Sequence, residues 1–203
     1  MEATRDEFYN IVIHLVSLIA SILCIYWIVC NHLIFYTNKY LFLLIYSIVQ
    51  CLTFTGSIVY HSLNKTEYFL LFRILDKGFI YVLIGATLAP FLITSGLGTF
   101  WYSTTLVVLA TCCLLTCVLV SRGFNTLSFA PYIGVGTFSF FLCLKILPYI
   151  SSQTSIKYLF YGGIIYCLGV SSYLLKNFKY HHEVWHVLAS IGSFLLLYAI
   201  LLL

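Results

Sequence analysis

Seven long stretches of the chain are almost free of charged residues, and each is long enough to cross a lipid bilayer as a helix. A membrane span takes about 20 mainly apolar residues. The stretches lie at roughly 10–30, 41–62, 76–97, 101–121, 127–147, 157–175 and 182–203. Backbone polar groups in lipid must pair internally, and these continuous runs are too long for barrel strands. We therefore predict an all-α, seven-transmembrane helical bundle.

The composition agrees with this architecture and excludes a water-soluble protein. Of the 203 residues, 62% are hydrophobic and only 8% are charged, whereas a soluble domain carries about 25% charged residues. The connections are too short for a further domain, so residues 1–203 are expected to form a single seven-helix integral membrane domain. The eight cysteines fall inside the apolar stretches without a CxxC pair, which favours a role as small packing residues.

Basic residues indicate the orientation of the bundle. If the N-terminus is cytoplasmic, seven basic residues lie on the inner side and three on the outer side, where the C-terminus then lies. The inner ones are Arg5, Lys65, Arg73, Lys77, Arg122, Lys176 and Lys179, and the outer ones are Lys39, Lys145 and Lys157. The positive-inside rule favours this arrangement.

Polar side chains that can coordinate a metal gather at the same inner level. With a cytoplasmic N-terminus, four helices begin or end there with such residues: Glu7, Asn10 and His14 in the first span, His61 in the second, Asp76 in the third, and His182 and His186 in the seventh. Polar groups at membrane depth are costly and usually have a function. This convergence predicts a polar site just below the inner surface.

Three of these histidines form a candidate metal site. His182 and His186 are four residues apart and lie about 40° apart around a helix, whereas His181 and His186 lie about 140° apart. Together with His61 they offer three imidazoles, and catalytic zinc typically keeps three protein ligands. The alternative is that these histidines only form hydrogen bonds between helices. An all-imidazole set also suits several other divalent metals.

Asp76 and Ser57 are candidate catalytic residues beside this site. Asp76 is expected in the first turn of its helix, where it would either pair with Lys77 or Arg73 at the surface or serve as a carboxylate that takes a proton from water. Ser57 is four residues before His61 and shares its face, although it could instead bond to its own helix. Glu7, Asn10 and His14 are expected to form a supporting polar cluster between helices.

Several motifs in order along the chain resemble the hemolysin III family, the bacterial branch of the progestin and adiponectin receptor (PAQR) superfamily. They are Glu7-x-x-Asn10-x-x-x-His14, Ser57-x-x-Tyr60-His61, Asp76-Lys77-Gly78 through Gly85-Ala86-Thr87 to Pro90, Gly162-Gly163 with Tyr166 and Gly169, and His182-Glu183-Val184-Trp185-His186. Of these, Gly162-Gly163 also predicts a close approach of two helices.

The resemblance implies a bundle with an inward N-terminus, in a bacterial plasma membrane. It further implies a zinc ion (Zn2+) held by His61, His182 and His186. It assigns Asp76 to the water at that ion, with Ser57 close by.

Three functions are compatible with these features. The first is a zinc-dependent hydrolase of membrane lipid amides or esters, or a regulator of membrane lipid homeostasis, because zinc lowers the pKa of water toward about 7. The second is a pore-forming cytolysin, although a pore needs a polar lining along its length, and the outer halves of the spans offer only scattered hydroxyls such as Thr87, Thr104 and Thr105. The third is a lipid or ligand receptor with structural zinc. A membrane lipid is the expected substrate or ligand, and no nucleic-acid partner is expected.

Overall fold

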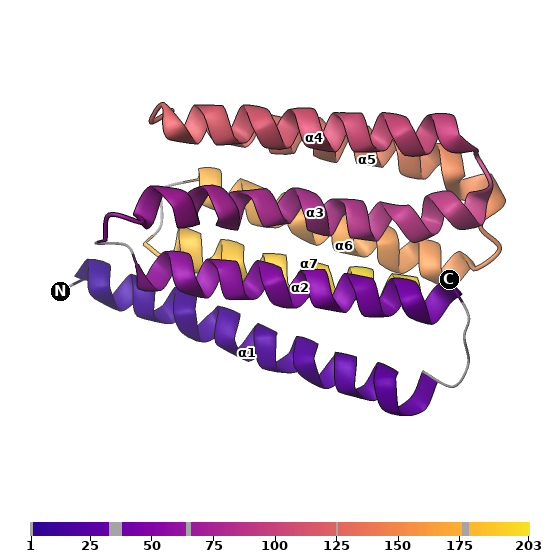
Figure 1. Cartoon of the computed structure of the whole chain (residues 1–203), viewed down its shortest axis with the longest axis horizontal. Helices are drawn as coiled ribbons and strands as arrows, with labels where there is room; N and C mark the ends of the chain where they lie inside the picture. The colour runs from indigo at the N-terminus through magenta and orange to yellow at the C-terminus, as the bar shows by residue number, and fades with distance from the viewer. Residues whose placement is uncertain (1, 33–37, 64–65, 125, 176–178) are drawn as a thin grey trace.

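The computed structural model describes residues 2–32, 38–63, 66–124, 126–175 and 179–203, and within them it contains seven α-helices and no strand (Figure 1). The helices are α1 (Glu2–His32), α2 (Asn38–Ser62), α3 (Phe69–Ser95), α4 (Thr99–Ser121), α5 (Ala130–Ile146), α6 (Gln153–Leu174) and α7 (His181–Leu201). Short 3-10 turns, Leu127–Phe129 and Leu147–Tyr149, flank α5. The prediction of an all-α helical bundle is confirmed. Two basic residues used for the orientation, Lys65 and Lys176, lie outside the described residues.

Six of the helical segments in the described part of the chain are long and apolar enough to cross a membrane. They are Asp6–Asn31, Asn38–Ser62, Phe69–Ser95, Thr99–Ser121, Leu127–Tyr149 and His181–Leu201. The chain is thus an integral multipass membrane protein. Helix α6 is not among the six, so its crossing of the membrane stays a prediction.

The third helix begins earlier than the sequence pattern predicts. Helix α3 starts at Phe69, and its first turn contains no acidic residue. Asp76 therefore lies about two turns inside the helix, and its predicted place in the first turn is wrong. The residues from Phe69 to Leu75 are apolar apart from Arg73, and the ring of Phe69 lies 5.3 Å from that of Tyr60 of α2. This segment therefore continues the helix toward α2.

The helices lie side by side along one long axis, with the two ends of the chain at opposite ends of the bundle (Figure 1). Helices α4 and α5 form one side, α1 forms the opposite side, and the remaining four lie between them. Helix α1 packs against α2 and α7, and it diverges from α2 toward its own C-terminal end (Figure 1). The N-terminal end of α1 thus lies beside the C-terminal end of α2, where the histidines are placed.

Close contact between α6 and α7 depends on glycine. A methyl group added at Gly162 would lie 2.6 Å from a side-chain carbon of Leu196 and 3.2 Å from the carbonyl oxygen of Gly192. The close approach predicted from Gly162-Gly163 is confirmed for Gly162, because small residues let helix backbones come near each other. Gly163 has no such neighbour within 4 Å.

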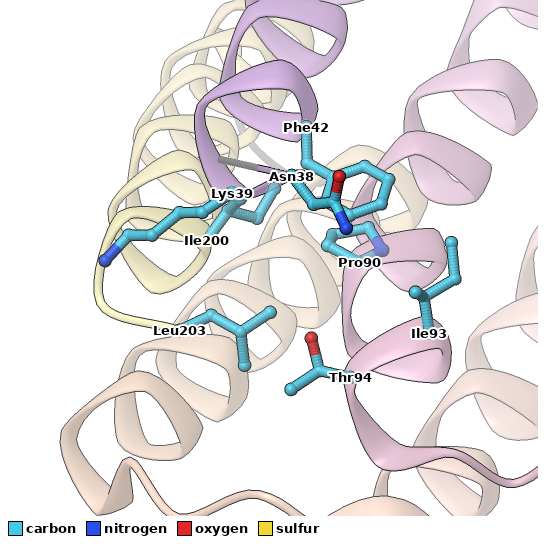
Figure 2. Close-up of a pocket in the computed structure, with 8 residues that line it drawn as sticks. All are labelled: Asn38, Lys39, Phe42, Pro90, Ile93, Thr94, Ile200 and Leu203. Carbon is cyan, nitrogen blue, oxygen red and sulfur yellow. The ribbon is translucent and has the colours of Figure 1, made fainter. Parts of the chain in front are cut away.

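A cavity of about 300 Å³ lies at the end of the bundle opposite the histidines (Figure 2). It is lined by Asn38, Lys39, Phe42, Pro90, Ile93, Thr94, Ile200 and Leu203. Figure 2 shows that the side chain of Lys39 extends away from the other lining side chains. The cavity is thus apolar apart from short amide and hydroxyl groups.

Candidate metal centre

Three histidines from three helices meet at the end of the bundle where α1 and α7 begin and α2 ends. His14, His61 and His186 each offer a ring nitrogen, and these nitrogens all lie within 4.8 Å of one another. The side chains are almost fully buried, with 4%, 2% and 5% of their surface exposed. A cluster of this kind can hold a metal ion, because neutral imidazole is a common ligand of divalent metals.

The hydrogen bonds around the cluster assign a role to each ring nitrogen. His61 Nδ1 lies 2.5 Å from Glu7 Oε2, and an ionised carboxylate can only accept, so this nitrogen donates. His61 Nε2 then carries a lone pair, and His186 Nε2, 3.2 Å away, donates to it. His186 Nδ1 in turn accepts from His14 Nε2 at 2.9 Å. These three hydrogen bonds together define the tautomer of each ring.

This arrangement is compatible with a cation between the rings. A single proton separates the facing Nε2 atoms of His61 and His186. A divalent metal can take its place when His186 carries its proton on Nδ1 and donates it to His14 Nε2, because each neutral imidazole then offers an Nε2 lone pair. In addition, His14 Nδ1 is buried without a hydrogen-bond partner among the described residues. A buried polar atom without a partner is uncommon in native structures and calls for an explanation. The donor set therefore fits a metal that prefers imidazole.

His182 lies next to these rings. Its ring centroid is 4.5 Å from that of His186 and 5.5 Å from that of His61. The 182/186 spacing thus brings both histidines to one face of α7, as the sequence predicts. The tightest group of nitrogens in the described chain nevertheless contains His14 in place of His182. His14 and His182 are therefore two candidates for a third ligand beside His61 and His186.

Ser57 and Asp76 form a pair beside the histidines. The Ser57 hydroxyl donates to Asp76 Oδ1 across the α2–α3 contact. The contact is close because of Gly56, where an added methyl group would lie 2.9 Å from a Phe79 ring carbon. Asp76 is half-buried and has no ion pair with Lys77 among the described residues. The ammonium of Lys77 instead lies 4.0 Å from the centroid of the Phe129 ring.

The predicted polar cluster of α1 is divided between two partners. Glu7 contacts His61 of α2, and His14 contacts His186 of α7. One turn further along, Ser17 donates to Ser190 of α7 at 2.9 Å. Asn10 is 2% exposed, and its Oδ1 has no hydrogen-bond partner in the described part of the chain. Helix α1 thus contacts both helices that carry the other histidines.

The sequence predicts His14 as part of the supporting cluster, and the structure places its ring nitrogen within the histidine group. Its spacing from Glu7 and Asn10 puts it on the same helix face. Glu183 is a residue of this region to which the sequence analysis assigns no role. The His-Glu-x-x-His pattern on a helix is a signal for it, because in zinc enzymes with this pattern the glutamate is the general base.

The fold and the cluster define an integral multipass membrane protein with a buried histidine site that can hold a metal ion. A family model described as Haemolysin-III related matches residues 3–197. The chain therefore belongs to this family. It is 26% identical over 208 residues to the hemolysin-3 homolog of Bacillus subtilis (strain 168). This alignment covers 99% of this chain and 95% of the relative. It is 27% identical over 161 residues to hemolysin-3 of Bacillus cereus, and this second alignment covers 77% of this chain and 72% of the relative.

Proposed function

We propose that this protein is a zinc-dependent hydrolase of membrane lipid amides or esters, or a regulator of membrane lipid homeostasis that uses the same centre. The observation that carries the proposal is the group of histidine nitrogens within 4.8 Å of one another in a membrane bundle. Buried imidazoles at membrane depth are costly, and this makes a functional role the default interpretation.

We infer that His61, His182 and His186 hold the ion. His61 Nδ1 is occupied by Glu7, and His186 Nδ1 by His14, which leaves the Nε2 atoms of both rings for a ligand role. His182 shares the face of His186 and its ring approaches both others. With the ion bound, Glu7 accepts from His61 Nδ1 and His14 Nε2 accepts from His186 Nδ1. These two acceptors hold the rings in orientation, as acceptors commonly do for metal-bound histidines. Bound zinc would act as a Lewis acid and lower the pKa of water.

Asp76 is the proposed proton acceptor, and Ser57 positions it. The hydrogen bond from Ser57 fixes one carboxyl oxygen, and the other remains for water or a substrate group. A general base must reach the proton it takes within hydrogen-bond distance, directly or through one water. The cytoplasmic orientation inferred from basic residues would place this pair near the inner leaflet of a bacterial plasma membrane, where lipid carbonyl groups lie.

Replacing Asp76 tests the hydrolase directly. Asp76→Asn should retain zinc but lower lipid hydrolysis by about 100-fold or more, because general bases contribute about 10²–10⁴-fold. Turnover is measured by mass spectrometry of lipids incubated with purified protein, and zinc by elemental analysis of the same sample. Undiminished turnover in Asp76→Asn would rule out its role as base. Bound zinc without turnover of any amide or ester lipid would instead favour a receptor with a structural ion.

The name of the Bacillus cereus relative, hemolysin-3, supports a second candidate, a pore-forming cytolysin. Three hydroxyls considered as a polar lining, Thr87, Thr104 and Thr105, each bond to a carbonyl of their own helix at 2.8–2.9 Å. Hydroxyls bonded in this way offer little to a water-filled path. Dye release from liposomes that does not change in Asp76→Asn or His61→Ala would favour the pore over the hydrolase.

A further inference from the structure

A groove of about 290 Å³ lies between the N-terminal parts of α1 and α7, beside the histidine cluster. It is lined by Tyr9, Val12, Ile13, Tyr180 and Glu183. Ile13 immediately precedes His14, and Glu183 lies between His182 and His186. Its remaining walls are apolar or aromatic, with the two tyrosines as they occur where a membrane protein meets the lipid–water interface. The groove is therefore shaped for an amphiphile.

Glu183 is the unusual residue in this groove. Only 8% of its surface is exposed, and its Oε1 atom has no hydrogen-bond partner among the described residues. It also forms no ion pair there, since the one such contact in the described chain joins Glu7 to His61. A buried carboxylate is costly unless it is paired with a cation and hydrogen-bonded. The first turn of α7, in which Glu183 lies, favours a negative charge, but among the described residues no group donates to Oε1.

The Glu183 carboxylate selects the charge of the partner. An alkylammonium head has three N–H donors and a full positive charge, so it suits a buried carboxylate at the wall of an apolar groove. An ester or phosphate head has no such donors and would add negative charge.

We propose that the α1–α7 groove binds an amphiphile with an ammonium head, which pairs with the Glu183 carboxylate while its alkyl chain lies along Tyr9, Val12 and Ile13. The partner is a long-chain amine, recognised by its cationic head. This site adjoins the metal centre, since Glu183 lies between His182 and His186, and its occupancy does not require an ion there.

Binding of radiolabelled octadecylamine to purified protein in phosphatidylcholine nanodiscs tests this site. The wild-type protein should show one saturable site, and octadecanol should compete weakly. Glu183→Gln keeps the shape of the side chain but removes its charge, and it should weaken amine binding by about tenfold or more, the scale of a charged hydrogen bond. Glu67→Gln is the matched control, because it removes an exposed carboxylate elsewhere and should bind like the wild type.

A second variant, Ile13→Trp, fills the groove and should reduce binding of both amine and alcohol. Amine binding by Glu183→Gln equal to that of the wild type, or equal affinity of the wild type for amine and alcohol, would overturn the proposal. Zinc content and thermal unfolding of each preparation separate this site from the metal centre. If the wild type binds octadecylamine but holds no zinc, the groove stands and the proposed hydrolase falls.

Discussion

Glu7 is the residue through which α1 acts on the histidine of α2. Its carboxylate accepts a hydrogen bond from His61 Nδ1 at 2.5 Å, which fixes the ring and keeps the lone pair of His61 on Nε2. Changing Glu7→Gln should weaken zinc binding by about 10–100-fold, the usual cost of losing such a partner. A competition titration against a zinc chelator measures this affinity. Glu67→Gln serves as the control, and an affinity within about twofold of the wild type would contradict the role.

His14 and His182 are the two candidates to complete the set with His61 and His186. Because His14 already bonds to His186 Nδ1, we expect His14→Ala to lower zinc affinity by about 10–100-fold and to leave a site that still fills. His182→Ala should remove zinc from the purified protein. The measurement is zinc content at saturating and limiting metal.

The neighbouring His181 provides a matched control for this pair. It starts α7 and its ring lies 5.8 Å from that of Tyr173, on a face away from His186, so His181→Ala should bind zinc normally. The opposite ranking, with zinc lost in His14→Ala and kept in His182→Ala, would make His14 the third ligand.

At the scale of single helices, the sequence predicts which residues share a face but not which faces meet. The spacing of Glu7, Asn10 and His14 correctly places them on one side of α1. Their partners on α2 and α7 depend on helix packing over more than 50 residues of chain, which local spacing does not encode.

The start of α3 differs from the prediction for a related reason. A charged residue after an apolar segment does not by itself mark the start of a helix, and α3 begins at Phe69, whose ring contacts Tyr60 of α2. This extension places Asp76 opposite Ser57 rather than in a surface turn. The sequence singles out the candidate site residues because polar groups stand out in apolar helices.

The contact between α6 and α7 gives a test at the same scale. Gly162→Ala should destabilise the protein by about 1–3 kcal/mol, because the new methyl group overlaps Leu196 and approaches the Gly192 backbone. Gly163→Ala makes the same chemical change on the neighbouring residue and should not destabilise. Thermal unfolding in detergent compares the two. Equal stability of both variants would mean that α7 adjusts without cost.

In the whole molecule, the candidate site residues lie at one end of the bundle and apolar side chains cover most of its outer surface. Large hydrophobic side chains such as Val16, Leu23 and Phe141 are exposed on the outside of the bundle, as expected for surfaces that face lipid. The histidines, Ser57 and Asp76 are gathered at one end, and the apolar cavity of Figure 2 lies at the other. The polar cluster that can hold a metal ion thus lies at one end of an otherwise apolar bundle.

The central claim is that histidines from separate helices share one metal ion. Elemental analysis of the protein purified without added metal or chelator tests it most directly, with His61→Ala as the comparison. The account predicts about one zinc per chain in the wild type, since one such centre keeps one ion, and almost none in His61→Ala. A folded wild-type protein that contains no zinc and cannot be loaded with it would contradict the account.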